Sequence, residues 1–273
     1  MSAAHGAVRG PAGTVRALAL DIGSSRTRAW APGLGVLADV PSGPVRRGRV
    51  MDAGAHHRLL RKVADSAFGG SAFGGSASTG LGDTVVMLCH PVLAGPEQRE
   101  AARRLVAGLG PARVVSVDSA RAAAAYAAPA DGGPLLVVDL GAELTEITLL
   151  VDGLVQDARQ AEVGLDDLPE PGGSPAPVVH AAADMVTDLW RSDRTGAVRG
   201  ALRRGVLVTG GGALRLDLTS RLALRLDARL RLANHPATST VRGAGLLLSS
   251  ALRRPGTAPG RRGAIGARPD RTR

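Results

Sequence analysis

Two short stretches of the sequence pair a carboxylate with a glycine at the end of an apolar run. LALDIGSSRT places Asp21 two residues before Gly23, and VVDLGAELTE places Asp139 two residues before Gly141. A glycine lets backbone N–H groups approach an anion closely, and a carboxylate can hold a hydrated magnesium ion that in turn holds a phosphate. The two stretches together predict phosphate-binding turns, although an ordinary hairpin turn is the preferred interpretation of a single D-x-G.

The first of these turns also carries hydroxyl groups that can donate hydrogen bonds to a phosphate. Ser24, Ser25 and Thr27 follow Gly23 directly or closely. In the second turn Thr145 is the corresponding hydroxyl residue. These residues, with the two glycines, are therefore candidate nucleotide-binding residues.

The second turn has a carboxylate where a phosphate-binding turn favours small residues. Glu143 follows Ala142 in this turn. A carboxylate within about 4 Å of a phosphate costs on the order of a few kcal/mol at an effective dielectric constant near 20. A Cβ at a position of positive φ would add strain of about 1 kcal/mol. We therefore expect weakened phosphate binding here, unless Glu143 turns toward solvent or coordinates the metal.

A third glycine-rich turn, in VLVTGGGALRLDL, lies between an apolar strand and a helix. Its candidate binding residues are Gly210, Gly211, Gly212 and Ala213. A helix N-terminus offers free N–H groups and a partial positive charge, so a phosphate or a ribose can dock there. A plain glycine-rich connection is the alternative. The order of all three turns is a stronger signal than any one of them.

The elements that must position these turns alternate between strands and helices. Short apolar or alternating runs predict strands over 14–21, 26–31, 33–40, 84–91, 112–118, 134–140, 145–153, 154–164, 205–209 and 229–236. Helical spacing predicts helices over 55–68, 96–110, 119–129, 178–192 and 238–252, and a further helix follows the glycine turn in GVLVTGGGALRLDLTSRLALRL. Residues 41–50 are expected to be a loop, and the Gly/Ser-rich repeat over 66–82 a linker. This order predicts two α/β halves with mixed sheets.

The motifs and their order resemble the actin superfamily, and within it the MreB-type rod-shape-determining proteins. LALDIGSSRT and LLVVDLGAELTEITLL resemble the two phosphate loops of that family, and GVLVTGGGALRLDL is similar to its adenosine motif. The resemblance implies two RNase-H-like subdomains around a cleft that binds ATP and Mg²⁺. By this resemblance Asp21 and Asp139 would face the metal and the phosphates. Gly210, Gly211 and Gly212 would approach the adenosine and the α-phosphate.

The resemblance also implies domain boundaries, and it shows where this chain differs from the family. We expect an N-terminal arm over 1–14, a first half over 15–133, a second half over 134–252 and a basic tail over 253–273. The small upper subdomains of both halves are expected to be missing, the second replaced by PEPGGSPAP. Asp118 is the candidate for the acidic residue that positions the hydrolytic water, but aspartate is one methylene shorter than the usual glutamate.

The composition limits which classes of protein this chain can belong to. Of 273 residues 44% are hydrophobic, which allows a sizeable core, and Cys89 is the only cysteine, which excludes a disulfide within the chain. The net charge of +10 comes almost wholly from arginine, and the tail holds part of the excess. No aromatic residues interleave with the tail arginines, so no specific nucleic-acid binding is expected. Without an apolar run long enough for a membrane, we expect a cytoplasmic protein.

The leading hypothesis is a shortened MreB-like protein of cell-shape, cell-wall or spore-wall morphogenesis that binds ATP weakly and is at most a weak ATPase. Its expected partners are other bacterial actins or cell-wall synthesis proteins. One alternative is a scaffold of the same fold that binds no nucleotide. Another is a basic protein whose arginine-rich tail contacts an anionic membrane.

Overall fold

The computed structural model describes residues 16–68, 81–128, 132–169 and 173–253. The first half contains, in chain order, β1 (Arg16–Ile22), β2 (Arg26–Ala31), β3 (Gly35–Pro41), β4 (Val45–Arg46), β5 (Arg49–Val50), α1 (Ala53–Phe68), β6 (Thr84–His90), α2 (Pro96–Ala107), β7 (Arg113–Asp118) and α3 (Ser119–Ala127). The second contains β8 (Leu135–Leu140), β9 (Thr145–Val151), β10 (Leu154–Ala161), η2 (Leu165–Asp167), α4 (Ala176–Ser192), α5 (Ala197–Arg204), β11 (Val206–Thr209), η3 (Gly211–Leu214), α6 (Leu216–Leu226), β12 (Leu230–Leu232), η4 (Pro236–Thr238) and α7 (Ser239–Arg253), where η marks a 3-10 turn.

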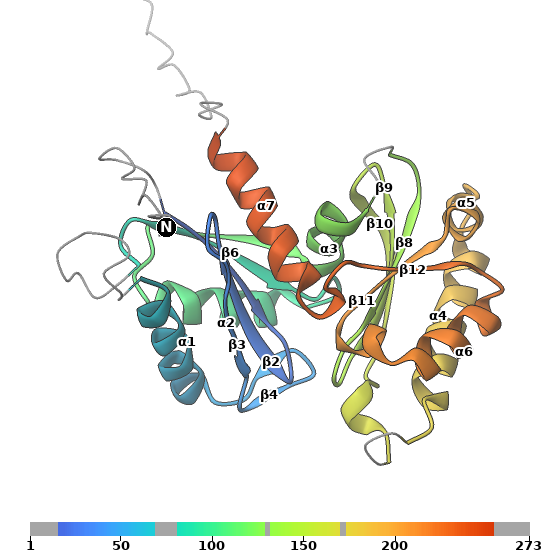
Figure 1. The fold of residues 1–273 in the computed structure, drawn as a ribbon, viewed down its shortest axis with the longest axis horizontal. Coiled ribbons are helices and arrows are strands. Elements are labelled where there is room, and N and C mark those ends of the chain that lie inside the picture. The colour runs from blue at the N-terminus through green and yellow to red at the C-terminus, as the bar shows by residue number, and fades with distance from the viewer. Residues whose placement is uncertain (1–15, 69–80, 129–131, 170–172, 254–273) are drawn as a thin grey trace, which may run out of the picture.

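The two halves are built on sheets of the same topology. The strand order is β3-β2-β1-β6-β7 in the first sheet and β10-β9-β8-β11-β12 in the second. In each sheet a three-stranded antiparallel meander continues into two parallel strands. Figure 1 shows the two sheets on either side of α3 and α7. The predicted α/β architecture of two similar halves is confirmed.

The alternation of side-chain size along β1 explains how the first sheet is covered. Successive residues of a strand point to opposite faces. Leu18 and Leu20 pack into one cluster with residues of α1 and α2, while Ala17 and Ala19 pack into another with residues of α7. Small side chains on that second face allow a helix to approach the sheet closely. The second sheet is covered in the same way, by α4, α5 and α6 on one face and by α3 on the other.

The two inner helices, α3 and α7, pack together without room for larger side chains. A Cβ added at Gly243 of α7 would lie 1.7 Å from the carbonyl oxygen of Ala122 in α3. A Cβ added at Gly245 would lie 2.0 Å from the ring of Trp30 on β2. By chain order α7 follows the second half, yet it packs against β1 and β6 of the first sheet. The helix therefore ties the two halves together.

Neither half carries an additional subdomain within the described residues. Between β3 and α1 the chain forms only the small β4–β5 hairpin, and between β10 and α4 it forms only η2. The prediction that residues 41–50 are a loop was wrong in one respect, because Val45 and Arg46 pair with Val50 and Arg49. Helix α5 had no counterpart in the sequence-based prediction.

Several sequence features fall wholly or largely outside the described residues. These are the N-terminal arm over 1–14, most of the Gly/Ser-rich repeat and the basic tail apart from Arg253. Across the described ranges, no helix has both the length and the apolar composition that a membrane span requires.

Candidate functional site

The two predicted phosphate turns have the same backbone geometry. The N–H of Gly23 donates to the carbonyl oxygen of Arg26 at 3.0 Å, and the N–H of Gly141 donates to that of Leu144 at 2.9 Å. A Cβ at Gly23 would lie 3.0 Å from the Arg26 oxygen, and a Cβ at Gly141 would lie 2.7 Å from the Leu144 oxygen. A side chain at Gly141 would therefore force its turn to shift, whereas one at Gly23 would fit only tightly.

The expected backbone strain in the second turn is absent. Positive φ among non-glycine residues occurs, within the described ranges, only at Arg47, Asp152, Asp227 and His235. Ala142 and Glu143 therefore hold conformations that side chains tolerate. The expectation that a Cβ would strain this turn was wrong, because the turn closes without left-handed residues.

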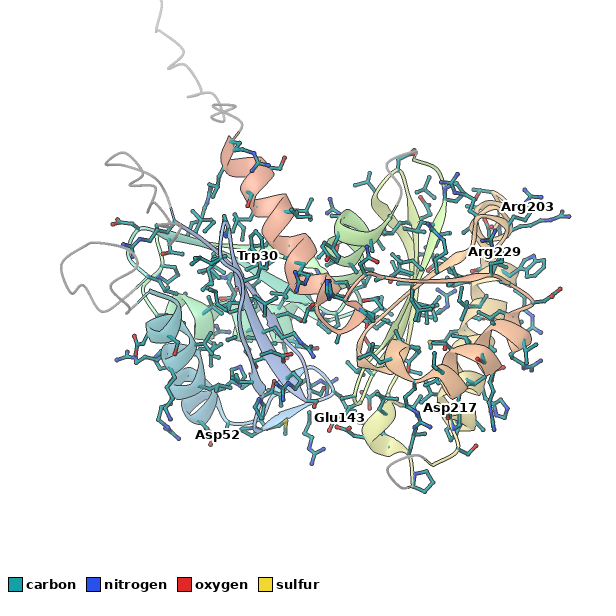
Figure 2. The ribbon with its side chains drawn as sticks, viewed as in Figure 1. Trp30, Asp52, Glu143, Arg203, Asp217 and Arg229 are labelled. Carbon is teal, nitrogen blue, oxygen red and sulfur yellow. The ribbon has the colours of Figure 1, made fainter. Side chains whose placement is uncertain are left out.

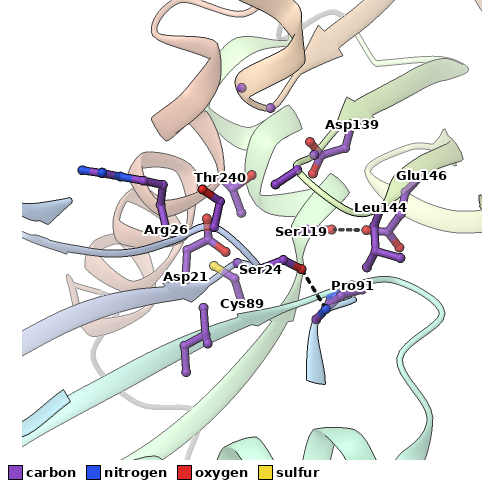
Figure 3. Close-up of a pocket in the computed structure, with 18 of the residues that line it drawn as sticks. Asp21, Ser24, Arg26, Cys89, Pro91, Ser119, Asp139, Leu144, Glu146 and Thr240 are labelled. Atoms are coloured by element: carbon purple, nitrogen blue, oxygen red, sulfur yellow. Dashed lines mark hydrogen bonds between the residues drawn. The ribbon is translucent and has the colours of Figure 1, made fainter. Parts of the chain in front are cut away.

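Both turns open onto one cavity of about 220 Å³ between the two halves (Figure 3). Eight of the predicted site residues line it: Asp21, Gly23, Ser24, Ser25, Asp139, Gly141, Gly210 and Gly211. The cavity is also lined by residues that were not predicted, among them Arg26, Arg28, Ser119, Glu146 and Thr240. The structure thus brings the ends of β1, β8 and β11 to a single place.

The third turn contributes two glycines with different roles. Gly210 has φ of +86°, and a Cβ there would lie 2.4 Å from Oδ1 of Asp139. Gly211 also lines the cavity, but a Cβ there would meet no atom within 4 Å. Gly212 and Ala213 are buried and do not line the cavity, and a Cβ at Gly212 would lie 2.7 Å from Cβ of Leu140. The structure brings only the first half of this predicted motif to the cavity.

The two predicted threonines are buried and engaged within the protein. Thr27 shares a hydrogen bond of 2.8 Å with Ser42, whose hydroxyl also donates to the Gly23 carbonyl at 2.6 Å. Thr145 donates to the carbonyl oxygen of Val163 at 2.8 Å. Neither residue lines the cavity. Their hydroxyl groups bond within the protein beside the two turns and are not exposed to a ligand in the cavity.

Three carboxylates that line the cavity have raised pKa values, in each case chiefly because the group is buried. Burial raises the pKa of Asp21, and nearby Arg28 partly opposes this. Burial, followed by the charge of Asp21, raises the pKa of Asp139 to about 6. Burial, followed by the charge of Asp139, raises the pKa of Glu146 to about 8. The site therefore concentrates negative charge that a cation or a proton must balance.

Glu146 is the buried acid that the sequence analysis missed. It accepts a hydrogen bond from the backbone N–H of Val92 at 2.9 Å and one from the Ser119 hydroxyl at 3.4 Å (Figure 3). The available signal was a charged residue inside a strand that is otherwise buried on both faces. Such a residue is costly unless it is paired or functional.

Asp118, the predicted catalytic acid, lies at the end of β7 and does not line the cavity. Its Oδ1 is 3.5 Å from Nδ1 of His90 and 3.7 Å from Nη2 of Arg99. Its neighbour Ser119 lines the cavity instead. Ser119 donates to Glu146 of β9, so the acid that lines the cavity beside this segment comes from the second half.

Glu143 lies outside the cavity and holds the β4–β5 hairpin. Its carboxylate accepts hydrogen bonds from the guanidinium of Arg46 and, at 2.7 Å, from the backbone N–H of Arg47. Burial alone would raise the pKa of Glu143, but the Arg47 N–H and the Arg46 guanidinium hold it below its usual value. Figure 2 shows Glu143 between the two halves. The expected repulsion of a phosphate by Glu143 is therefore not supported, because its charge is paired elsewhere.

The hairpin is anchored to both turns, and we call Arg46, Arg47 and Gly48, with Glu143, the latch. Its two central residues, Arg47 and Gly48, have φ of +47° and +71°, as a type I′ turn requires. The N–H of Gly48 donates to Oγ of Ser24 at 3.1 Å, so the same hairpin contacts the first turn. The Arg47 guanidinium also pairs with Asp167 at 3.1 Å. The latch thus joins the two halves beside the cavity.

A directly ligated metal ion finds few protein donors here. No group of three or more His, Cys, Asp or Glu in the described part of the chain is arranged to hold one. Asp21 and Asp139 both line the cavity. Their carboxylates fit the predicted hydrated magnesium ion, which they would hold through its water molecules. Gly210 and Gly211 fit a nucleotide, because the absence of a side chain at Gly211 leaves open space beside the backbone.

Comparison with known proteins establishes the fold. No protein-family model and no curated protein matches the sequence. MreB5 of Spiroplasma citri bound to ADP superposes with a TM-score of 0.73 at 16% identity, over 88% of this chain and 98% of the other. The same protein bound to AMPPNP superposes with a TM-score of 0.74 at 16% identity, over 87% of this chain and 97% of the other. The ethanolamine utilization protein EutJ from Carboxydothermus hydrogenoformans superposes with a TM-score of 0.61 at 18% identity, over 88% of this chain and 92% of the other.

These likenesses confirm the predicted actin-like fold, in a form without the small upper subdomains. At 16–18% identity they are evidence about the fold alone.

Proposed function

We propose that the cavity binds an adenine nucleotide. The observation that carries this proposal is the convergence of two turns of the same geometry, one from each half, on a cavity that Gly210 and Gly211 also line. Two carboxylates at matched positions, Asp21 and Asp139, face the same space. MreB5, which has this fold, was solved with ADP and with AMPPNP.

In this proposal each segment has its own role. The first turn offers the Ser24 and Ser25 side chains and the backbone around Gly23 to the phosphates. The second turn offers the backbone around Gly141 and Ala142. The third turn accepts the nucleoside side of the ligand at Gly211, where no side chain intrudes. ATP, when bound, supplies a phosphoanhydride bond that water can hydrolyse.

We propose that hydrolysis is slow or absent. A general base must be unprotonated near neutral pH and must reach the attacking water. Glu146 has a pKa raised to about 8 and stays largely protonated at pH 7. The Asp118 carboxylate lies 3.5 Å from His90 and 3.7 Å from Arg99 and does not line the cavity. At most a weak ATPase is consistent with this arrangement.

The wider role that we propose is in cell-shape, cell-wall or spore-wall morphogenesis, beside other bacterial actins or wall-synthesis proteins. The likeness to MreB5 supports it. EutJ has the same fold and its name places it in ethanolamine utilization, so the nucleotide proposal does not depend on the wider role. Contact of the tail arginines with an anionic membrane belongs to the same proposal.

A second candidate is a scaffold of the same fold that binds no nucleotide. The latch favours it, since Gly48 occupies part of the cavity wall and holds the two halves together without a ligand. The cavity of about 220 Å³ is also smaller than the roughly 300–1,000 Å³ of ordinary ligand sites.

Calorimetric titration with ATP distinguishes the two candidates. The wild type should bind ATP, and Gly211→Leu should abolish binding because its side chain extends into the cavity. Gly95→Leu is the matched control, since a Cβ at Gly95 also meets no atom within 4 Å but lies outside the cavity lining. Absence of ATP binding by the wild type would support the scaffold. Equal binding by wild type and Gly211→Leu would place the nucleotide elsewhere.

A further inference from the structure

Arg28 lies beside the carboxylates of the cavity. In the antiparallel pairing of β1 with β2, Arg28 is directly opposite Asp21. Residues opposite one another in a sheet have their side chains on the same face. Both residues line the cavity, as does Asp139. The sheet register therefore places a guanidinium where the sequence predicted only acids and hydroxyls.

The Arg28 guanidinium has unused hydrogen-bonding capacity. Its Nε is buried, and it forms no hydrogen bond within the described residues. Its ion-pair partner there is Asp39, with Oδ1 at 3.3 Å from Nε. The same Asp39 oxygen accepts a shorter hydrogen bond of 2.7 Å from Arg26. One carboxylate thus serves two arginines, and Arg28 retains N–H donors for a further acceptor.

The electrostatics of the cavity agree with this geometry. The charge of Arg28 lowers the pKa of both Asp21 and Asp139, against the effect of burial. At the equivalent position of the second half, opposite Asp139, stands Glu146. The cavity therefore has a guanidinium opposite the aspartate of the first turn and a carboxylate opposite the aspartate of the second.

We infer that Arg28 is the resident cation of this site and that it binds a phosphate group of the nucleotide without a divalent metal. A guanidinium offers planar paired donors that match a phosphate, and it stays charged at any physiological pH. Asp21 and Asp139 could hold a metal ion only through water, so the inference assigns the charge that faces the phosphate to Arg28 instead. The inference rests on the proposed nucleotide site and specifies how its charge is balanced.

The test is titration of the whole protein with ATP in EDTA and in excess Mg²⁺. The wild type should bind ATP with affinities within about threefold of each other in the two buffers. Arg28→Gln should lose at least tenfold in EDTA, a change of about 1.4 kcal/mol, and should recover part of it with Mg²⁺. Arg28→Lys should keep part of the EDTA affinity, because it keeps the charge and loses the paired donors.

Arg61→Gln, an exposed position on α1, is the control and should bind as the wild type does. Thermal melting of each variant checks that it folds. Binding by the wild type only with Mg²⁺ would overturn the inference and leave the nucleotide proposal standing. Metal-independent binding that Arg28→Gln retains would overturn the role of Arg28 alone. No binding in either buffer would overturn both.

Discussion

The two turns of the cavity share a backbone and differ in charge. Each begins with an aspartate and a glycine, closes with the same hydrogen bond and continues into a strand that pairs back on the first. Opposite its aspartate the first turn has Arg28, whereas the second has Glu146. In contact with the hairpin the first turn uses the Ser24 hydroxyl, whereas the second uses the Glu143 carboxylate. One scaffold thus supports two different electrostatic environments.

The difference shows how a carboxylate can enter such a turn without facing the ligand. Glu143 is only 5% exposed, yet it does not line the cavity, because the hairpin supplies its partners. Glu146, three residues later, lies in the cavity and has only neutral hydrogen-bond donors. The two glutamates therefore have pKa values shifted in opposite directions.

The largest expected effect is a pH dependence that follows from Glu146. An acid with a raised pKa binds its proton more tightly in the folded state, so its contribution is present below the unfolded pKa near 4.5 and is lost as the pH rises toward about 8. A single such group changes the free energy of unfolding by up to about 1.4 kcal/mol per pH unit. Glu146→Gln should flatten the dependence between pH 5 and 8, measured by urea denaturation.

Glu143 provides the contrast in the same experiment. Its lowered pKa means that its contribution is present above the unfolded pKa and is lost only on acidification. Glu143→Gln should therefore leave the slope between pH 5 and 8 unchanged. A wild-type stability that does not fall over that range would contradict the assigned environment of Glu146.

The next effect compares the two turn glycines. Gly141→Ala brings a Cβ to 2.7 Å from a backbone oxygen, so the turn must shift, and it should lower the free energy of unfolding by about 2–3 kcal/mol. Gly23→Ala brings a Cβ to 3.0 Å and should cost about 1 kcal/mol. Chemical denaturation of both variants measures the difference. Equal costs would contradict this expectation and would mean that the second turn relaxes more than the first, despite its closer contact.

A similar comparison separates the two anchors of the latch. Glu143→Ala removes a charged acceptor and should cost about 2 kcal/mol, whereas Ser24→Ala removes one neutral hydrogen bond and should cost about 1 kcal/mol. Because Glu143 lies outside the cavity, Glu143→Ala should not bind ATP more tightly than the wild type. Tighter binding by this variant would restore the view that Glu143 repels the phosphate.

The smallest effect is expected from the exposed partner in the latch. The Arg46 side chain is 73% exposed, and exposed ion pairs contribute little to stability. Arg46→Ala should therefore shift the melting temperature much less than Glu143→Ala, and added salt should reduce even that shift. An equally large shift would show that the guanidinium, and not the Arg47 backbone, holds the hairpin.

The sequence by itself determined the parts of this protein that depend on neighbouring residues. The apolar runs around Leu18 and Val137 predict buried strands, and Gly23 and Gly141 each donate a hydrogen bond to the carbonyl oxygen three residues later. The order of these local units was enough to predict two actin-like halves and eight of the residues that line the cavity.

Only the tertiary structure decided which side chains face the cavity. Glu143 meets Arg46 across 97 positions of sequence, and Glu146 meets Val92 across 54. The charge of Arg28 acts on Asp139 of the second half because α3 and α7 hold the two sheets together. A local pattern can specify that a residue is charged, but the partner that sets its pKa and its orientation comes from another part of the fold.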